Sequence, residues 1–220
     1  MSKFIGQVIG FVIKLTLLIV LPFIVLIRGS VFFHEHYQFG PYFSLILGGL
    51  ITFVVLLIYF TVLYGQLFGK AKLSKKSMKA KAGFASFIML FYLGYTLFYL
   101  SNANAKTDAV HKEFTSLHPI VRVSVGTILL LDQSMLITDM SRTKEDYKLM
   151  GLKTLNNSLH YPQKDGYVHA IDLRTNDRSE FRNTLLKLYF NAMGFHTLRH
   201  VGTGDHLHIS LSIHENPNAI

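Results

Sequence analysis

The sequence predicts an α+β protein in which a bundle of three transmembrane helices precedes one small domain built on an antiparallel sheet. Apolar residues make up 50% of the 220-residue chain, and they are concentrated before Leu100 in three stretches long enough to cross a membrane. The rest of the chain has the short β-rich runs and helical patterns of a globular domain. We therefore divide the chain into a membrane anchor at residues 1–100, a linker at 101–118 and a domain at 119–220.

The three apolar stretches account for a mean hydropathy of +0.33, which is high for a soluble protein. The first runs from Phe4 to Ile27 and includes Lys14 and Pro22, whereas the second, Tyr42 to about Leu67, and the third, Gly83 to Leu100, contain no charge. A helix rises 1.5 Å per residue, so about 20 apolar residues cross the hydrocarbon. A cleaved signal peptide is not indicated, because no small-residue cleavage site follows the first stretch and further spans come next.

Lysines between the second and third stretches predict the orientation. There are six of them and no acidic residue: Lys70, Lys72, Lys75, Lys76, Lys79 and Lys81. Such a loop stays in the cytoplasm, which places everything after the third stretch outside, even if the first stretch lies only in the interface. We expect a multi-pass protein of the cytoplasmic (inner) membrane with an extracytoplasmic C-terminal domain.

The formal net charge of +9 suggests nucleic acid or anionic lipid as a partner. Much of the excess lies in the lysine-rich loop beside the membrane, where attraction to anionic lipid explains it. We expect membrane lipid as a partner and no binding to nucleic acid.

The predicted loop between the first two stretches, Arg28 to Pro41, contains the run His34-Glu35-His36. These residue types can ligate a metal, but the sequence shows no third ligand nearby. We therefore expect an interfacial loop without a metal.

The second half predicts a linker, strands and helices. Ser101 to Lys112 is polar and lacks periodicity, as a linker does. Ser179 to Met193 is the clearest helix, with Ser179 as its N-cap and Gly194 as its C-cap. The remaining elements are β-rich segments at Val121 to Leu131 and Ile137 to Met140, a helix at Lys144 to Leu155, a strand at Val168 to Leu173, and a hairpin of Phe195 to Val201 and His206 to Ile213.

Three short segments carry residues suited to metal chemistry: Ser158-Leu159-His160, Ala170-Ile171-Asp172 and Asp205-His206-Leu207-His208. The chain has eleven histidines and no cysteine, so thiolate ligands and disulfides are excluded. A strand places His206 and His208 on one face, about 7 Å apart along the chain. Two imidazoles and one carboxylate are typical of a catalytic zinc, whose open position holds a water with a lowered pKa.

The order of these segments matches a family signature: a Ser-x-His segment, an Ala-x-Asp strand, and later an acidic residue three positions before a final His. The region from about Ile137 to Leu211, about a third of the chain, resembles the D-Ala-D-Ala carboxypeptidase/dipeptidase family of zinc peptidases. That family shares its fold with phage endolysins that cut L-Ala–D-Glu bonds and with the Hedgehog signalling domain. Thr138 to Thr143, which includes Arg142, looks like the family's strand-to-helix segment.

The resemblance implies a zinc site and its catalytic groups. His160, Asp172 and His208 would be the zinc ligands. Asp205 would be the general base, and His206 would polarise the carbonyl or stabilise the developing oxyanion.

Two further residues complete the implied site. Arg142 would bind a substrate carboxylate or the oxyanion, and Ser158 would orient the substrate or the metal loop. The protein would then be a membrane-anchored zinc metallopeptidase that cuts peptidoglycan stem peptides on the outer face of the cytoplasmic membrane. Two alternatives stay open: a catalytically inactive peptidoglycan- or partner-binding module of the same fold, and a membrane structural protein whose histidines bind no metal.

One departure from the family pattern concerns the first ligand. Eleven residues separate His160 from Asp172, and Gly166 lies in a longer loop, Tyr161 to Tyr167, where the family has a shorter interval. Loops accept extra length at little entropic cost, so an insertion is compatible with the site. His169 is the alternative first ligand. We favour His160, because His169 and Asp172 differ by three and would point to opposite faces of a strand.

Overall fold

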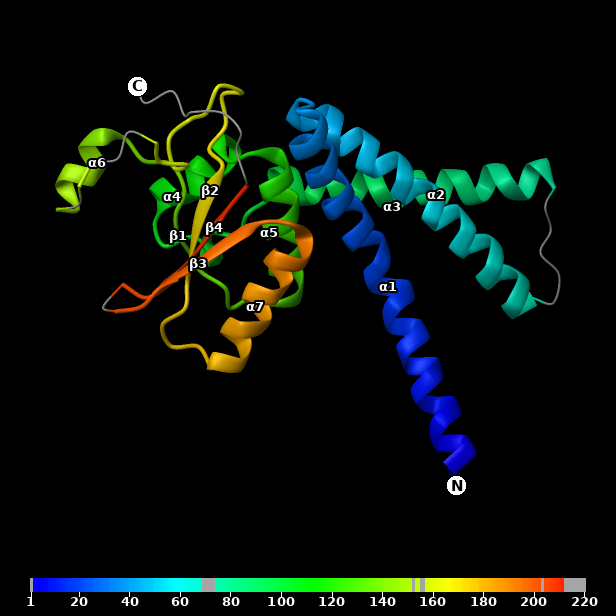
Figure 1. Ribbon diagram of the computed structural model, residues 1–220. Helices are drawn as coiled ribbons and strands as arrows, with labels where there is room; N and C mark the ends of the chain where they lie inside the picture. Colours follow the sequence, from blue (N-terminus) through cyan, green and yellow to red (C-terminus); the bar gives the residue numbers. More distant parts are fainter. Residues whose placement is uncertain (1, 69–73, 152, 155–156, 203, 212–220) are drawn as a thin grey trace.

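The computed structural model of the protein describes residues 2–68, 74–151, 153–154, 157–202 and 204–211. Three long helices leave one side of an α+β domain: α1 (Ser2–Tyr37), α2 (Pro41–Phe68) and α3 (Lys75–Phe98) (Figure 1). Within the described residues, these three are long and apolar enough to cross a membrane. The predicted membrane anchor of three helices is therefore confirmed as far as length and composition decide it.

The first helix is longer at its C-terminal end than the sequence predicted. The expected loop from Arg28 to Pro41 is helical as far as Tyr37. The part of the described helix that is long and apolar enough to cross a membrane is Ile19–Tyr37. Apolar residues continue through this segment without a strong helix breaker. The helix ends only at Gln38, whose φ of 55° is left-handed, and Pro41 then begins α2.

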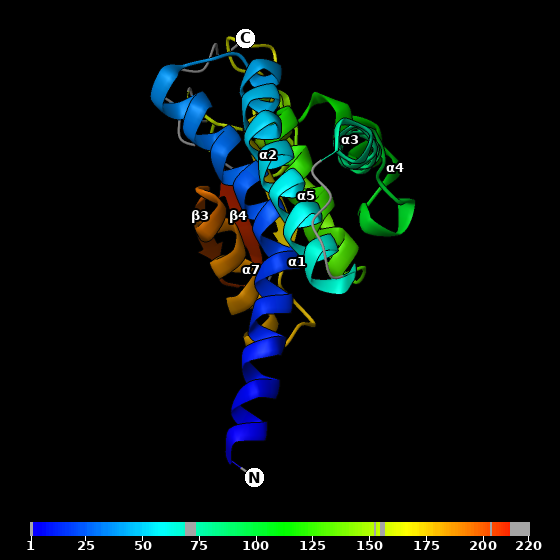
Figure 2. The same cartoon turned by 90° about the vertical axis from the view of Figure 1, so that its right-hand side faces the viewer.

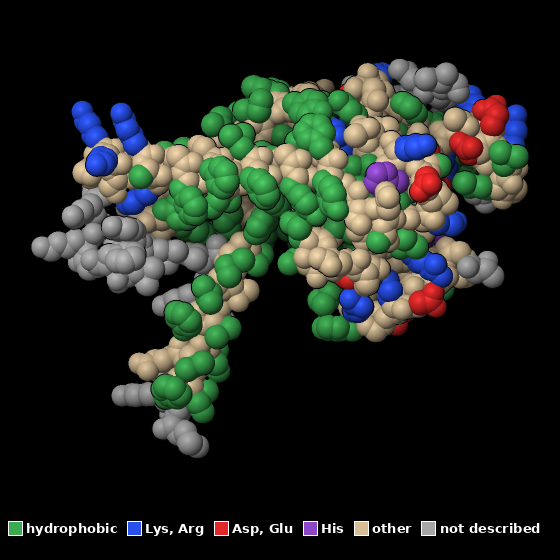
Figure 3. All heavy atoms as spheres, turned by 180° about the vertical axis from the view of Figure 1, so that it is seen from behind, with side chains coloured by type: hydrophobic (Ala, Val, Ile, Leu, Met, Phe, Trp, Pro, Cys, Tyr) green, Lys and Arg blue, Asp and Glu red, His purple; other side chains and the backbone are tan. Residues whose placement is uncertain are grey.

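The lysines predicted to lie in a loop belong mostly to the first turns of α3. This helix begins at Lys75 rather than near Gly83, because Ser74 caps it by accepting a hydrogen bond from the Ser77 amide at 3.2 Å. Lys70 and Lys72 lie outside the described residues. The described lysines gather at the end of the α2–α3 arm that is remote from the domain, and hydrophobic side chains cover the arm itself (Figure 3).

The domain is built on a four-stranded antiparallel sheet in the order β1–β2–β4–β3, which confirms the predicted α+β class. The strands are β1 (Ile137–Asp139), β2 (Ala170–Arg174), β3 (His196–His200) and β4 (His206–Ser210). The helix α7 (Glu180–Met193) connects β2 to β3 and packs beside the sheet (Figure 2), capped as predicted by Ser179 and by Gly194.

The prediction of a β-rich segment at Val121 to Leu131 is wrong. This segment forms the helix α5 (Pro119–Leu131). His118 caps this helix and Pro119 starts it, which are ordinary helix signals. Every residue from Pro119 to Thr127 is buried, so the helix has no polar face to reveal its period. A short apolar run rich in valine and isoleucine cannot be assigned to helix or strand by periodicity.

Two other segments differ from expectation. The helix predicted over Lys144 to Leu155 is the shorter α6 (Lys144–Leu149), since Gly151 has a left-handed φ of 68°. The expected linker at 101–118 contains short helices that contribute to the core. They are η1 (Asn102–Asn104), α4 (Asp108–Lys112) and η2 (Glu113–Ser116).

The ends of the long helices that are nearest the domain share one hydrophobic core with it. Leu26, Ile27 and Val31 of α1 belong to the same buried cluster as the residues of α5, β2 and β4. Arg122 of α5, which is buried, donates a hydrogen bond from Nη1 to the Leu97 carbonyl of α3 at 2.9 Å. The domain is therefore packed onto the helices rather than joined by a free tether.

Candidate metal centre

Strand register brings two of the predicted ligands together. Asp172 of β2 lies directly opposite His208 of β4 in the antiparallel ladder. Residues opposite one another in such a ladder project their side chains to the same face, with Cβ atoms about 5 Å apart. Their neighbours Ile171 and Leu207 project to the opposite face and are buried in the core. Alternation along two strands therefore puts an aspartate and a histidine side by side, away from the core.

The third ligand comes from the loop before β2. The His160 amide donates a hydrogen bond to the Ser158 hydroxyl at 3.2 Å, and this hydroxyl is 2.5 Å from that of Tyr147. His160 Nδ1 donates to the Met140 carbonyl at 2.6 Å. A neutral imidazole carries one proton, so this bond leaves the lone pair on Nε2. Both contacts orient His160 toward the sheet. Ser158 is buried, so its hydroxyl stabilises the loop that carries His160 and is not presented at the surface.

We call His160, Asp172 and His208 the sheet site. His160 Nε2 lies 3.2 Å from His208 Nδ1 and 3.4 Å from Asp172 Oδ1, and His208 Nδ1 lies 2.9 Å from the same oxygen. Zinc–nitrogen bonds of 2.0–2.1 Å imply edges of about 3.3 Å in a tetrahedral site. The three separations fall around that value, and imidazole with carboxylate is a donor set suited to zinc. These residues therefore fit a zinc-class ion.

Asp172 stays ionised in this buried position. Burial acts to raise the pKa of its carboxyl group, but the adjacent imidazoles of His160 and His208 and the charge of Arg142 outweigh it and hold the pKa well below its usual range. Arg142 Nη2 binds Asp172 Oδ2 at 2.5 Å, which leaves Oδ1 facing the two imidazoles. A second interaction, from Arg142 Nε to Asp139 at 2.6 Å, fixes the guanidinium.

The predicted catalytic residues lie at different places around this site. His206 Nε2 is 3.7 Å from Asp172 Oδ2, so this imidazole borders the site. Asp205 instead accepts hydrogen bonds from Arg199 at 2.7 Å and from Thr175 at 2.6 Å. The hydrogen bonds from Arg199 and Thr175 lower the pKa of Asp205 to about 2, which makes it a weak base.

A cleft of about 680 Å³ opens beside the sheet site, and Asp172, Arg142 and His206 line it. Asp205 also lines the cleft, together with Glu113 of η2. Burial raises the pKa of Glu113, and the Ser141 amide, which donates a hydrogen bond to its carboxylate at 3.2 Å, offsets this only in part. The cleft therefore holds a carboxylate closer than Asp205 to the pKa that proton transfer at neutral pH requires.

We compared the chain with known proteins by sequence and by structure. No family model, curated protein or solved structure matches it.

The sequence selected the three residues that the structure brings together, and it favoured His160 over His169 as the first. His169 lies elsewhere, with its Nε2 2.8 Å from Asp165 Oδ2. That the three residues bind a metal stays a prediction. Sequence reasoning missed Glu113, because the segment that carries it had the composition of a linker. The available signal was the spacing of Val110, Phe114 and Leu117, which are all buried.

Proposed function

We propose that the protein is a membrane-anchored, zinc-dependent peptidase whose domain faces the outer side of the cytoplasmic membrane. The observation that supports this most is the convergence of His160, Asp172 and His208 beside a cleft lined by polar side chains. When bound, a zinc ion supplies a Lewis acid that polarises a peptide carbonyl and brings the pKa of a water molecule toward neutrality.

The residues of the chain divide the remaining tasks. Arg142 holds the Asp172 carboxylate in place, so it is a positioning residue rather than a free carboxylate clamp. His206 lines the cleft, and its Nδ1 donates to the Gly204 carbonyl at 2.6 Å, so it is the protonated ring that can donate through Nε2 to the oxygen of the scissile carbonyl. Glu113 fits the general base better than Asp205, because its pKa is raised toward neutral pH whereas that of Asp205 is about 2.

The proposed substrate is a peptide that ends in a carboxylate, such as a peptidoglycan stem peptide. Lys106 and Arg174, which pairs with Asp177 at 2.8 Å, are two cationic side chains of the cleft that can receive such a terminus. The proposed orientation is supported by the lysines of α3, which lie at the end of the arm remote from the domain. With these lysines in the cytoplasm, the cleft opens on the side where a cell-wall peptide is found.

The test uses the full chain in detergent micelles, because the domain shares its core with the long helices. Synthetic stem peptides are incubated with the protein, with and without a chelator, and the products are identified by mass spectrometry. We expect the wild type to cleave the peptides, and we expect the chelator and the His160→Ala substitution each to abolish this cleavage. The control is His196→Ala, which changes an exposed histidine of β3 and should leave the cleavage unchanged. Cleavage that survives both the chelator and His160→Ala would contradict the proposal.

A second candidate function is a binding module of the same fold without catalysis. The engagement of Asp205 by Arg199 and Thr175 favours it, because the resemblance assigns the base to that position. Under this alternative, stoichiometric zinc and stem-peptide binding are found without turnover. Under the peptidase proposal, Glu113→Gln removes turnover and leaves zinc bound.

A further inference from the structure

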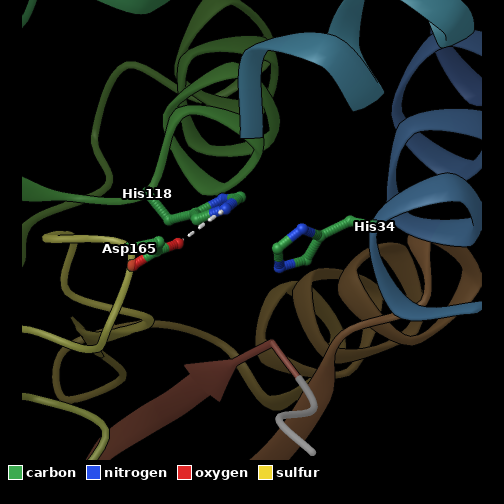
Figure 4. Close-up of side chains that lie close together, drawn as sticks. All are labelled: His34, His118 and Asp165. Atoms are coloured by element: carbon green, nitrogen blue, oxygen red, sulfur yellow. Dashed lines mark ion pairs between the residues drawn. The ribbon is translucent and has the colours of Figure 1, made fainter. Parts of the chain in front are cut away.

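A second group of histidines lies where α1 meets the domain. It contains His34 near the outer end of α1, His118 at the N-cap of α5, and Asp165 in the loop before β2. Figure 4 shows the His34 ring projecting from its helix toward the His118 ring and the Asp165 carboxylate. Ligand atoms of these three residues all lie within 4.8 Å of one another. Segments far apart in the sequence thus deliver three potential metal ligands to one point.

The separation between His118 and Asp165 suits coordination, and His34 lies beside them. His118 Nε2 is 3.5 Å from Asp165 Oδ2, close to the edge of about 3.3 Å expected in a tetrahedral zinc site. The rings of His34 and His118 have centroids 4.6 Å apart. His34 Nδ1 donates to the Phe39 carbonyl at 2.8 Å, so its Nε2 keeps the lone pair that a metal requires.

His118 carries the strongest sign of an unused ligand. Its side chain is 0% exposed, and among the described residues its Nε2 has no hydrogen-bond partner. A buried polar nitrogen without a partner is unfavourable in an ordinary core. Its Nδ1 accepts a hydrogen bond of 3.3 Å from the Ile120 amide, so coordination through Nε2 moves the ring proton to Nδ1 and costs this long cap hydrogen bond.

Asp165 is held in place by a fourth residue. His169 Nε2 donates to Asp165 Oδ2 at 2.8 Å, and His169 is itself buried. Its ring lies 4.6 Å from that of His118. Asp165 belongs to the loop from Tyr161 to Tyr167, which lengthens the interval between His160 and Asp172. The longer loop thus contains the proposed ligand Asp165, and it leads to His169, which holds Asp165 in position.

We propose that His34, His118 and Asp165 form a second site for a divalent zinc-class ion, which we call the junction site. Two imidazoles with one carboxylate favour such an ion over calcium or magnesium, which prefer oxygen ligands. Because the ligands come from α1, α5 and the loop before β2, a bound ion fastens the first membrane helix to the domain. Its role is structural, and it does not depend on the proposed peptidase activity.

The experiment measures zinc in the full-length protein, purified in detergent, stripped with a chelator, reloaded with Zn²⁺ and desalted. The parent variant is Asp172→Asn, which disables the sheet site. We expect one zinc per chain in this parent, measured by mass spectrometry of the metal. Adding Asp165→Asn or His34→Ala reduces the content to near zero, and Zn²⁺ then no longer raises the midpoint of thermal unfolding.

The matched control is His36→Ala in the same parent. His36 is exposed on the same helix and stacks on Phe32 with ring centroids 5.2 Å apart. This variant should keep one zinc per chain. Asp165→Asn preserves the size of the side chain in a loop, so misfolding does not explain its loss of zinc. A parent that holds no zinc, or an Asp165→Asn variant that holds as much as the parent, overturns the junction site and leaves the peptidase proposal intact.

Discussion

The sheet site and the junction site use the same side-chain types but are held by different parts of the fold. Two ligands of the sheet site are cross-strand partners, and its third comes from a nearby loop. The junction site takes one ligand each from a membrane helix, the cap of a buried helix and a loop. The sheet site borders a cleft, whereas His118 of the junction site is fully buried. The adjoining cleft, rather than the burial of the ligands, distinguishes the two sites, because His160 and Asp172 are buried as well. Catalysis needs such a cleft for the substrate, whereas a structural ion does not.

The largest expected contrast between the sites is in turnover. Asp172→Asn should lower the rate of stem-peptide cleavage on the order of 10³-fold or more, because the metal contributes several kcal/mol to the transition state. Asp165→Asn should change the rate by less than about threefold, about 0.65 kcal/mol, since it removes no group at the cleft. Initial rates at equal protein concentration check both. Equal losses in the two variants would show that the sites are not functionally separate.

A smaller effect is expected where an outer residue orients a ligand. Arg142→Lys removes the guanidinium that binds Asp172 Oδ2 and Asp139 together. Outer-shell changes of this kind weaken metal affinity about 10- to 100-fold. Competition with a chromogenic chelator measures the zinc affinity, with Arg182→Lys, which lies at an exposed ion pair with Asp132, as the control. An unchanged affinity in Arg142→Lys would mean that Arg142 does not position the ligands of the sheet site.

The two sites also differ in how far the sequence could predict them. His160, Asp172 and His208 lie in local patterns whose side-chain direction follows from alternation along a strand, so their order and spacing carried information. His34 lies in α1 and His118 is the N-cap of α5. The local sequence around these two residues does not predict that α1 and α5 are in contact. The sequence predicted His34 to lie in a loop without a third ligand nearby, whereas packing between distant segments places His118 and Asp165 beside it.

The fold shows the same division between local and non-local information. The helix α7 was predictable because Ser179 and Gly194 mark its ends and one face is apolar. The helix α5 was not, because Pro119 to Thr127 are all buried and the segment is rich in β-branched residues. Its helical state is stabilised by contacts with α3, where Gly126 lies against Thr96. Those contacts appear only after both segments are placed.

Docking of α1 on the domain can be loosened without touching a ligand. A Cβ at Gly194 would lie 3.0 Å from Val31 Cγ1 and 1.9 Å from the flexible end of Arg28, both in α1. Gly194 also has a φ of 100°, so Gly194→Ala adds strain of about 1–3 kcal/mol. We expect a lower unfolding midpoint and weaker zinc binding at the junction site, with the sheet site unchanged.

The control for backbone strain is Gly151→Ala. Gly151 has a similar left-handed φ of 68°, but a Cβ there would meet no described atom within 4 Å. This variant should lose stability from strain alone and keep the zinc affinity of the junction site. If both variants weaken that affinity equally, contact between α1 and α7 does not support the site.

The smallest expected effect concerns Asp205, and it decides whether this residue is structural. Hydrogen bonds from Arg199 and Thr175 hold the pKa of Asp205 at about 2, below the ordinary value of 3.8. A depressed folded-state pKa stabilises the protein above the unfolded pKa, and this contribution is lost as the pH falls through the folded value. The midpoint of thermal unfolding of the wild type should therefore exceed that of Asp205→Asn above about pH 4. The difference should narrow toward pH 2. A constant difference across this range would mean that the ion pair with Arg199 does not stabilise the fold, and it would return Asp205 to consideration as the general base.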